Sequence, residues 1–185
     1  SVNWCFSKPI SALSGLSLVV GLALARALQS LGLKGIGLKW ANDVFVEGKK
    51  CGGILLEGQG DLNGPCRVVI GLGLNLALPA SLEQQIDQAA DAISCPQGRN
   101  ALLAACLKML SEYLPQLEQH GFALFVDEFN ALHIYHQQEV VIGDVEGVVL
   151  GVNPDGALRI DVGGAEKTFY AGEVSVRPAL RSTSA

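Results

Sequence analysis

Residues 37–57 read GLKWANDVFVEGKKCGGILLE and carry most of the chain's polar chemistry. From 35 to 40, small or charged residues alternate with Ile, Leu and Trp, which is the period of a β-strand. Asn and Asp then interrupt this pattern with a turn, because their side chains hydrogen-bond nearby backbone groups. We predict further strands at 44–46 and 49–57, joined by a turn at 47–48.

Four polar side chains gather around these turns: Lys39, Asn42, Asp43 and Lys50. Lys39 falls on the strand face that otherwise carries glycines, so no bulky neighbour on its own strand covers it. The glycine pair at 52–53 lets a backbone or a ligand approach the last strand closely. These residues form the candidate binding cluster of the chain.

A strand predicted over 66–76 supplies a facing wall for this cluster. Its even positions are bulky and apolar, whereas its odd positions include Gly71, Gly73 and Asn75. One face therefore packs on a core, and the other is open and ends in an amide. The Gly-Leu-Gly-Leu-Asn motif is not a dinucleotide fingerprint, because a third glycine and a following helix are missing. Close packing of two strands is an alternative reason for these glycines.

The other segments before residue 139 predict one strand and four helices. The strand is expected at 1–7 and the helices at 11–30, at 82–93, from 100 onward, and at 122–132. Ser14 or Ser17 is the expected N-cap of the first helix and Asn100 that of the third, which Pro115 is expected to kink or end. The first helix is apolar nearly all round, which indicates a central core element. The two helices after residue 100 are expected to cover one face of the sheet.

From residue 139 the pattern changes to short strands. Turn residues separate five predicted strands, at 139–142, 145–152, 157–162, 166–170 and 174–176. So many short strands within about forty residues favour a small barrel of the SH3-like kind. Residues 177–185 are expected to form a frayed tail.

Composition excludes several classes of protein. The 185 residues are 49% hydrophobic, enough for one domain, or one with a small satellite. A net charge of -5 argues against nucleic-acid binding. The apolar run at 16–31 is interrupted by polar residues and is too short to span a bilayer, and no signal peptide is visible. Five widely spaced cysteines without a Cys-x-x-Cys pair predict reduced, mostly buried thiols and a cytoplasmic protein.

The candidate cluster suits a phosphorylated or adenylated ligand. Lys39 and Lys50 supply cations for phosphate or carboxylate, and Asp43 can hold magnesium. Asn42 and Asn75 add amides, and the glycines offer backbone N–H groups. Each residue alone has a structural explanation, since hairpin lysines are usually solvated and Asn-Asp is a common turn. Their joint occurrence beside the glycine face favours a site.

The histidines add no catalytic set. No Ser-His-Asp arrangement is visible in the sequence. Solvated positions in or beside helices are expected for His120, His133 and His136.

Together these motifs resemble those of the bacterial biotin protein ligase family. Residues 39–43 are similar to its Lys-Trp-Pro-Asn-Asp, residues 50–55 to Lys-x-x-Gly-Ile-Leu, and residues 71–75 to Gly-x-Gly-x-Asn. The stretch at 171–177 is similar to Gly-Gly-Glu-Ile-Ser-Leu-Arg. Ala41 stands where the family usually has Pro, which changes the turn but no functional group. The resemblance covers nearly the whole chain.

This resemblance implies a two-step ligase. The biotin carboxylate attacks the α-phosphate of ATP to give biotinyl-5'-AMP and pyrophosphate, and a lysine of a biotin carboxyl carrier protein then takes the biotinyl group. Lys50 is expected to contact the biotin carboxylate and the charge that develops at phosphorus. Lys39 and Asp43 are expected to organise the Mg2+-bound phosphates.

The resemblance also assigns the walls of the pocket. Gly53 and Gly71, with Lys50, are expected to bind biotin. Asn42 and Asn75, with Lys39 and Asp43, are expected to bind ATP and the adenylate.

The fold implied by the resemblance is α+β. A mixed or antiparallel sheet with helices on one face, similar to class II aminoacyl-tRNA synthetases, is expected at 1–137, the SH3-like barrel at 138–178 and a flexible tail at 179–185. Family members carry an Arg- and Gly-rich loop that is not found in this sequence. The chain is therefore similar to the C-terminal part of a ligase, and we expect it to be inactive or severely impaired. Homodimers that pair their sheets edge to edge are common in the family.

Two other functions stay open. A lipoate or octanoyl ligase or transferase shares the fold and a similarly placed lysine, although the Lys-Trp dipeptide and the small barrel favour biotin. A non-enzymatic biotin-binding or regulatory module is the second alternative.

Overall fold

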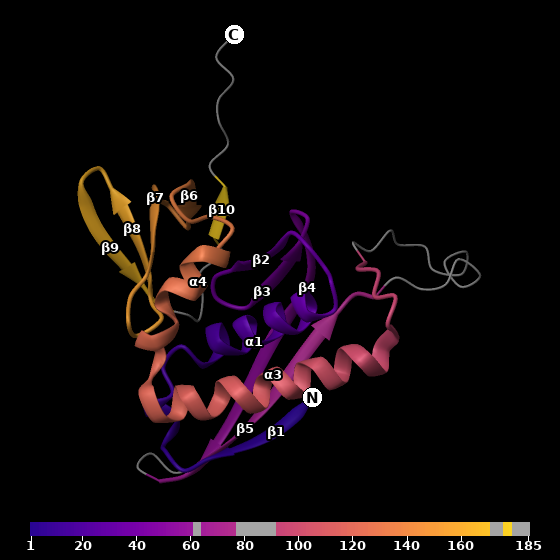
Figure 1. Ribbon diagram of the computed structural model, residues 1–185. Helices are drawn as coiled ribbons and strands as arrows, with labels where there is room; N and C mark the ends of the chain where they lie inside the picture. The colour runs from indigo at the N-terminus through magenta and orange to yellow at the C-terminus, as the bar shows by residue number, and fades with distance from the viewer. Residues whose placement is uncertain (61–63, 77–91, 171–175, 179–185) are drawn as a thin grey trace.

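Two antiparallel sheets and a layer of helices build the chain (Figure 1). The computed structural model describes residues 1–60, 64–76, 92–170 and 176–178. Within them the first sheet has the strand order β1-β5-β4-β3-β2 and the second the order β10-β6-β7-β8-β9. The α+β class predicted from the sequence is confirmed.

The first sheet contains five of the predicted site residues, and the other two, Asn42 and Asn75, lie next to the ends of its strands. Its strands are β1 (Val2–Phe6), β2 (Ile36–Lys39), β3 (Asp43–Val46), β4 (Lys49–Gly60) and β5 (Cys66–Leu74). The predicted strands are confirmed, although β4 runs three residues beyond 57 because it stays paired with β5 as far as Gly60 and Cys66. As the alternation at 1–7 predicts, Phe6 is buried and Cys5 is exposed.

Helices cover one face of this sheet. They are η1 (Ile10–Ala12), α1 (Leu16–Ser30), α3 (Gly98–His120), η2 (Phe122–Phe125) and α4 (Val126–Leu132). Helix α1 lies against β2, β3 and β4 and is covered in turn by α3, so it is buried nearly all round. The central core helix is thus confirmed. No helix in the described residues has the length and apolar character needed to cross a membrane.

The predicted start of α1 is wrong. Gly15, not Ser14 or Ser17, is its N-cap, and no side chain caps the helix. Gly15 has φ 77°, and a side chain there would collide with the Phe122 ring. The Ser17 hydroxyl instead donates to the Ala41 carbonyl at 3.0 Å, which links the helix to the turn after β2.

The later helices also differ from the prediction at their ends. Helix α3 begins at Gly98 after Gln97, not at Asn100, and it continues through Pro115 to His120. The segment 122–132 divides into a 3-10 turn and a short α-helix. The helix predicted at 82–93 falls mainly on residues 77–91, outside the described part of the chain.

The second sheet confirms the predicted run of short strands. They are β6 (Glu139–Ile142), β7 (Val145–Val152), β8 (Leu158–Val162), β9 (Ala165–Phe169) and β10 (Val176–Pro178). Arg177 belongs to β10 rather than to the predicted tail, whose residues 179–185 lie outside the described part. The described strands form an open order with β9 and β10 at its edges. Closure into a barrel therefore stays a prediction.

Candidate functional site

Four neighbouring strands bring predicted site residues to one face of the first sheet. Asp43 on β3 pairs with Lys39 on β2 and with Gly53 on β4, and Gly53 pairs with Gly73 on β5. Residues that face one another across a strand pair share a side of the sheet. These four residues therefore form one row across the sheet, and the candidate site lies along this row.

The site face points away from the helices. Leu38 and Ile54 are buried on the opposite face, against α1. A methyl group placed on Gly21 of that helix would lie 3.5 Å from both side chains. Their sequence neighbours Lys39 and Gly53 consequently project to the other side.

Lys50 reaches the same face because β4 carries a bulge. Strict alternation would put Lys50 and Gly53 on opposite faces, since three positions separate them. Phe45 pairs with Lys50 but Val44 pairs with Gly52, so Cys51 is an extra residue on β4. An extra residue of this kind reverses the alternation. The sequence showed that the two lysines were close along the hairpin but could not show this bulge.

Asp43 lies between the two lysines. Lys50 Nζ is 2.6 Å from Asp43 Oδ1, and Lys39 Nζ is 4.0 Å from Asp43 Oδ2. The Asp43 side chain is only 18% exposed, whereas that of Lys50 is 56% exposed. One carboxylate between two ammonium groups leaves a net positive charge, which suits an anionic ligand. Lys50 is the more accessible cation for that role.

Asn42 holds the turn against β4. Its Nδ2 donates to the Ile54 carbonyl at 3.1 Å, and the Ile54 amide donates to the Asn42 carbonyl at 2.9 Å. The peptide bond between Trp40 and Ala41 is cis. Part of the hydrogen-bonding capacity of Asn42 is used within the protein, which leaves its Oδ1 and the second Nδ2 hydrogen for a ligand.

A cavity of about 740 Å³ opens on this face. Its lining includes six of the seven predicted site residues: Asn42, Asp43, Lys50, Gly53, Gly71 and Asn75. The seventh, Lys39, is not among the lining residues and lies behind Asp43. The volume is within the range of small-molecule sites.

Glycines leave the floor of the cavity free of side chains. A methyl group on Gly53 would lie 3.7 Å from Asp43 Oδ1, and one on Gly73 would lie 3.8 Å from the Gly53 carbonyl oxygen. On Gly71 it would lie 3.4 Å from the Leu55 carbonyl oxygen. These contacts are near ordinary van der Waals distances, so side chains would fit the backbone here but would occupy the space of a ligand.

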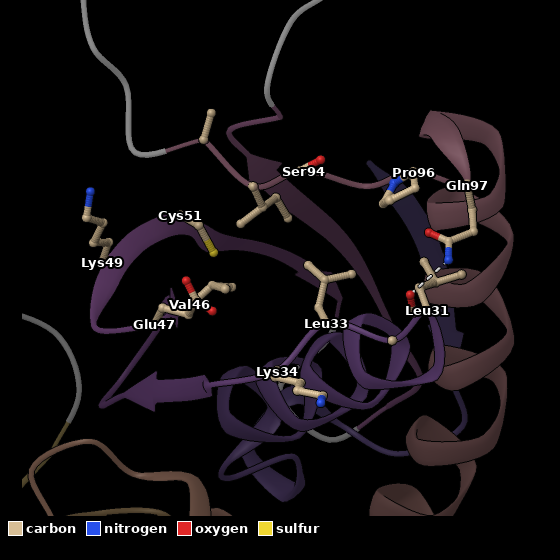
Figure 2. Close-up of a pocket in the computed structure, with 13 residues that line it drawn as sticks. Leu31, Leu33, Lys34, Val46, Glu47, Lys49, Cys51, Ser94, Pro96 and Gln97 are labelled. Carbon is tan, nitrogen blue, oxygen red and sulfur yellow. Dashed lines mark hydrogen bonds between the residues drawn. The ribbon is translucent and has the colours of Figure 1, made fainter.

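A larger cavity of about 900 Å³ lies on the other side of β4 (Figure 2). Cys51 points into it, between Glu47 and the segment at 92–97. Burial raises the pKa of the Cys51 thiol to about 11, so the sulfur is a poor nucleophile. This cavity contains none of the predicted site residues, and size alone does not make it the functional site.

His133 is buried, so the prediction that all three histidines are solvated is wrong for this one. Its ring stacks on Phe129 at 5.5 Å, and burial lowers its pKa to about 4. His120 is exposed, as predicted. The sequence carried only a weak signal of this burial, the spacing of four residues from Phe129, because His133 lies just after the last residue of α4 and has extended backbone.

The cysteines agree with the prediction of unpaired, mostly buried thiols. All five are free, and Cys51, Cys66 and Cys106 are buried. Among residues 1–60, 64–76, 92–170 and 176–178, no three His, Cys, Asp or Glu side chains gather into a metal site.

Two family models match the chain. Residues 5–75 match the biotin/lipoate A/B protein ligase family, and residues 140–177 match the biotin protein ligase C terminal domain. The first match contains the complete candidate cluster.

Curated relatives are similar over almost the whole chain. The bifunctional ligase/repressor BirA of Escherichia coli K12 is 32% identical over 186 residues, which cover 97% of this chain and 58% of the relative. The biotin--[acetyl-CoA-carboxylase] ligase of Mycobacterium tuberculosis is 29% identical, with 90% of this chain and 64% of the relative covered. The chain thus spans about three fifths of the length of these relatives.

Solved structures share the fold. The apo biotin protein ligase from Aquifex aeolicus has a TM-score of 0.73 and 25% identity, covering 96% of this chain and 82% of that one. The structure of the Aquifex aeolicus ligase in complex with biotin and ATP has a TM-score of 0.71 and 25% identity, covering 96% and 78%.

Proposed function

Because the chain belongs to the biotin/lipoate A/B protein ligase family and carries the biotin protein ligase C-terminal segment, we propose that it serves ATP-dependent biotin ligation. A biotin carboxylate oxygen bonds to the α-phosphorus of ATP as the bond to pyrophosphate breaks. The amine of a carrier-protein lysine then attacks the acyl carbon, AMP leaves, and the amine loses a proton. The acceptor proposed is a biotin carboxyl carrier protein.

The observation that carries this proposal is the Lys50–Asp43–Lys39 cluster, in which Lys50 and Asp43 line the glycine-floored cavity. Both reacting groups, a carboxylate and a phosphate, are anions that repel one another. A fixed ammonium group between them lowers this repulsion and stabilises the charge that develops at phosphorus. Lys50 is accessible for that role, and Asp43 keeps it on the site face until the ligand arrives.

Asp43 also fits a magnesium ion brought by ATP. Mg2+ binds through one or two carboxylates together with substrate phosphates and retains several waters. Asp43 supplies the one carboxylate among the described lining residues of the cavity. Asp43 would hold the ion, which would neutralise phosphate charge, while Lys39 behind it orients the carboxylate.

The remaining assignments follow from the walls of the cavity. Gly53 and Gly71 leave room for the bicyclic ring system of biotin. Asn75 and the free Oδ1 of Asn42 offer polar contacts to the adenylate. The Aquifex aeolicus complex with biotin and ATP supports the same pair of ligands for this chain.

We further propose that the chain divides into two units. Residues 1–137 form the catalytic unit and 138–178 an SH3-like barrel, and the match to the C-terminal family segment at 140–177 supports this boundary. Free thiols support a reducing, cytoplasmic location. We also propose that two copies pair through their sheets, and gel filtration tests this oligomeric state.

Calorimetry with biotin, lipoate and ATP tests the ligand. We expect biotin to bind, and to bind more tightly when ATP is present. The C-terminal family match favours biotin over lipoate. Preferential binding of lipoate or octanoate would instead support the alternative ligase, and biotin binding without any response to ATP would support a non-enzymatic module.

A further inference from the structure

We infer that the turn at residues 153–156 of the second sheet positions the candidate site through Trp40. The inference rests on the proposed function and adds two positioning residues, Trp40 and Asn153, which were not among the predicted site residues. The turn connects β7 and β8, far from the site in sequence.

A buried hydrogen bond joins the two parts of the chain. Trp40 Nε1 donates to the Gly156 carbonyl at 3.0 Å, and Trp40 is 3% exposed. Trp40 follows the last residue of β2 and precedes the Ala41-Asn42-Asp43 turn. A contact that holds the Trp40 indole in place therefore also holds the start of the segment that contains Asp43.

The accepting turn is rigid because Asn153 organises it. Asn153 Oδ1 accepts hydrogen bonds from the Asp155 amide at 3.0 Å and the Ala157 amide at 2.9 Å. The Gly156 amide also donates to the Asn153 carbonyl at 2.9 Å. These bonds set the direction of the Gly156 carbonyl, which is the acceptor for Trp40.

Close packing leaves this turn little freedom to move. Gly156 has φ +79°, and a methyl group on it would lie 2.9 Å from the Gly15 Cα atom at the start of α1. From the first turn of the same helix, Ser17 donates to the Ala41 carbonyl. Trp40 and Ala41 are consequently held by two different elements immediately before the site residues.

The tertiary contact therefore acts on the site through the backbone. If the Gly156 carbonyl turned away, Trp40 would bury an unpaired indole N–H, at a cost that favours a shift of its segment. Such a shift would carry Asn42 and Asp43 with it. The second sheet thus contributes to ligand binding without lining the cavity.

Tryptophan fluorescence tests this inference without any ligand. The chain has two tryptophans, so Trp4→Phe leaves Trp40 as the sole tryptophan, which is excited selectively at wavelengths that tyrosine does not absorb. In that parent, Asn153→Ala should raise acrylamide quenching of Trp40 at least twofold. Asn153→Asp, which keeps the accepting oxygen, and Asp155→Ala, in the same turn, should both match the parent. Unchanged quenching in Asn153→Ala would overturn the inference.

Binding then tests the consequence for the site. Asn153→Ala should weaken binding of biotin with ATP about three- to tenfold, the range expected for one hydrogen bond. Trp40→Phe, which leaves the turn intact, should weaken this binding by a similar factor. It replaces Asn153→Ala as the test variant if Asn153→Ala does not fold. Altered quenching with unchanged affinity would overturn the positioning role. A parent that bound neither ligand would refute the proposed function, while the quenching comparison would still decide whether the turn controls Trp40.

Discussion

Lys50 Nζ lies 2.6 Å from Asp43 Oδ1, although the strand alternation alone would direct Lys50 to the opposite face from Gly53. The bulge at Cys51 makes this contact possible. Because the Lys50 side chain is 56% exposed, the ion pair adds little to stability, and its value lies in holding a cation beside the cavity.

Lys50→Ala should weaken binding of biotinyl-5'-AMP by about tenfold or more, because it removes a charge-assisted contact worth about 1.5–3 kcal/mol. The free energy of unfolding should change by less than about 1 kcal/mol. Calorimetry and urea denaturation measure the two effects. Lys108→Ala, an exposed lysine on α3, is the matched control and should change neither. Unchanged affinity in Lys50→Ala would show that Lys50 is only solvated surface.

Adjacent glycines should respond differently to the same substitution. Gly52→Ala would bring its methyl group against the Gly73 carbonyl oxygen, so we expect destabilisation of about 1–3 kcal/mol. Gly53→Ala meets nothing closer than 3.7 Å and should fold with near-normal stability. Its methyl group occupies the cavity, however, and should lower biotin affinity about tenfold.

Urea denaturation and biotin titration of the two variants distinguish the strand contact from the ligand site. Equal biotin affinity in Gly53→Ala and the unmodified chain would place the biotin ring elsewhere. Equal stability in Gly52→Ala and Gly53→Ala would contradict the close approach of β4 and β5.

Asp43→Asn should uncouple ATP binding from magnesium. In the unmodified chain we expect Mg2+ to strengthen ATP binding, because Asp43 shares the ion with the phosphates. In Asp43→Asn the two lysines lose their carboxylate partner, so ATP binding without Mg2+ should be kept or improved and the response to Mg2+ should fall. Calorimetric titration of ATP with and without Mg2+ measures this. Asp144→Asn, at an exposed turn, is the control. If Mg2+ strengthened ATP binding equally in Asp43→Asn and in the unmodified chain, Asp43 would be ruled out as a ligand of the ion.

His133 should make stability depend on pH. Burial, and secondarily the charge of His136, lowers the pKa of His133 from 6.5 to about 4. The unfolded chain therefore takes up a proton at a higher pH than the folded chain does. The free energy of unfolding should be constant above about pH 6.5 for this group and fall by about 2–3 kcal/mol as the pH drops toward 4.

A histidine replacement isolates that contribution. His133→Phe keeps the ring stacked on Phe129 but cannot be protonated, so the fall between pH 6.5 and 4 should become smaller. Within the described residues neither His133 ring nitrogen has a hydrogen-bond partner, so no bond is lost at pH 7. His120→Phe, at an exposed position, should keep the original pH dependence. Identical urea midpoints for His133→Phe and the unmodified chain at every pH would contradict this account.

Some of the fold follows directly from local patterns. The alternation at 1–7 and 66–76 predicted which side of β1 and β5 is buried, and the stretch at 11–30, apolar nearly all round, predicted a central helix. Helix ends were less predictable because a glycine at a tight packing point, Gly15, replaces a side-chain cap. Pro115 did not end α3, whose apolar positions on both sides of it pack in the core.

By itself the sequence determined the residue types of the site, their order along the hairpin and the strand period that carries them, because the pleat of a strand is a local property. Only the tertiary structure decided which face Lys50 occupies, that His133 is buried and that Gly156 accepts a bond from Trp40. Each of these depends on a pairing register or a contact between distant segments. Such contacts are set by how whole surfaces fit together, and no local period encodes them.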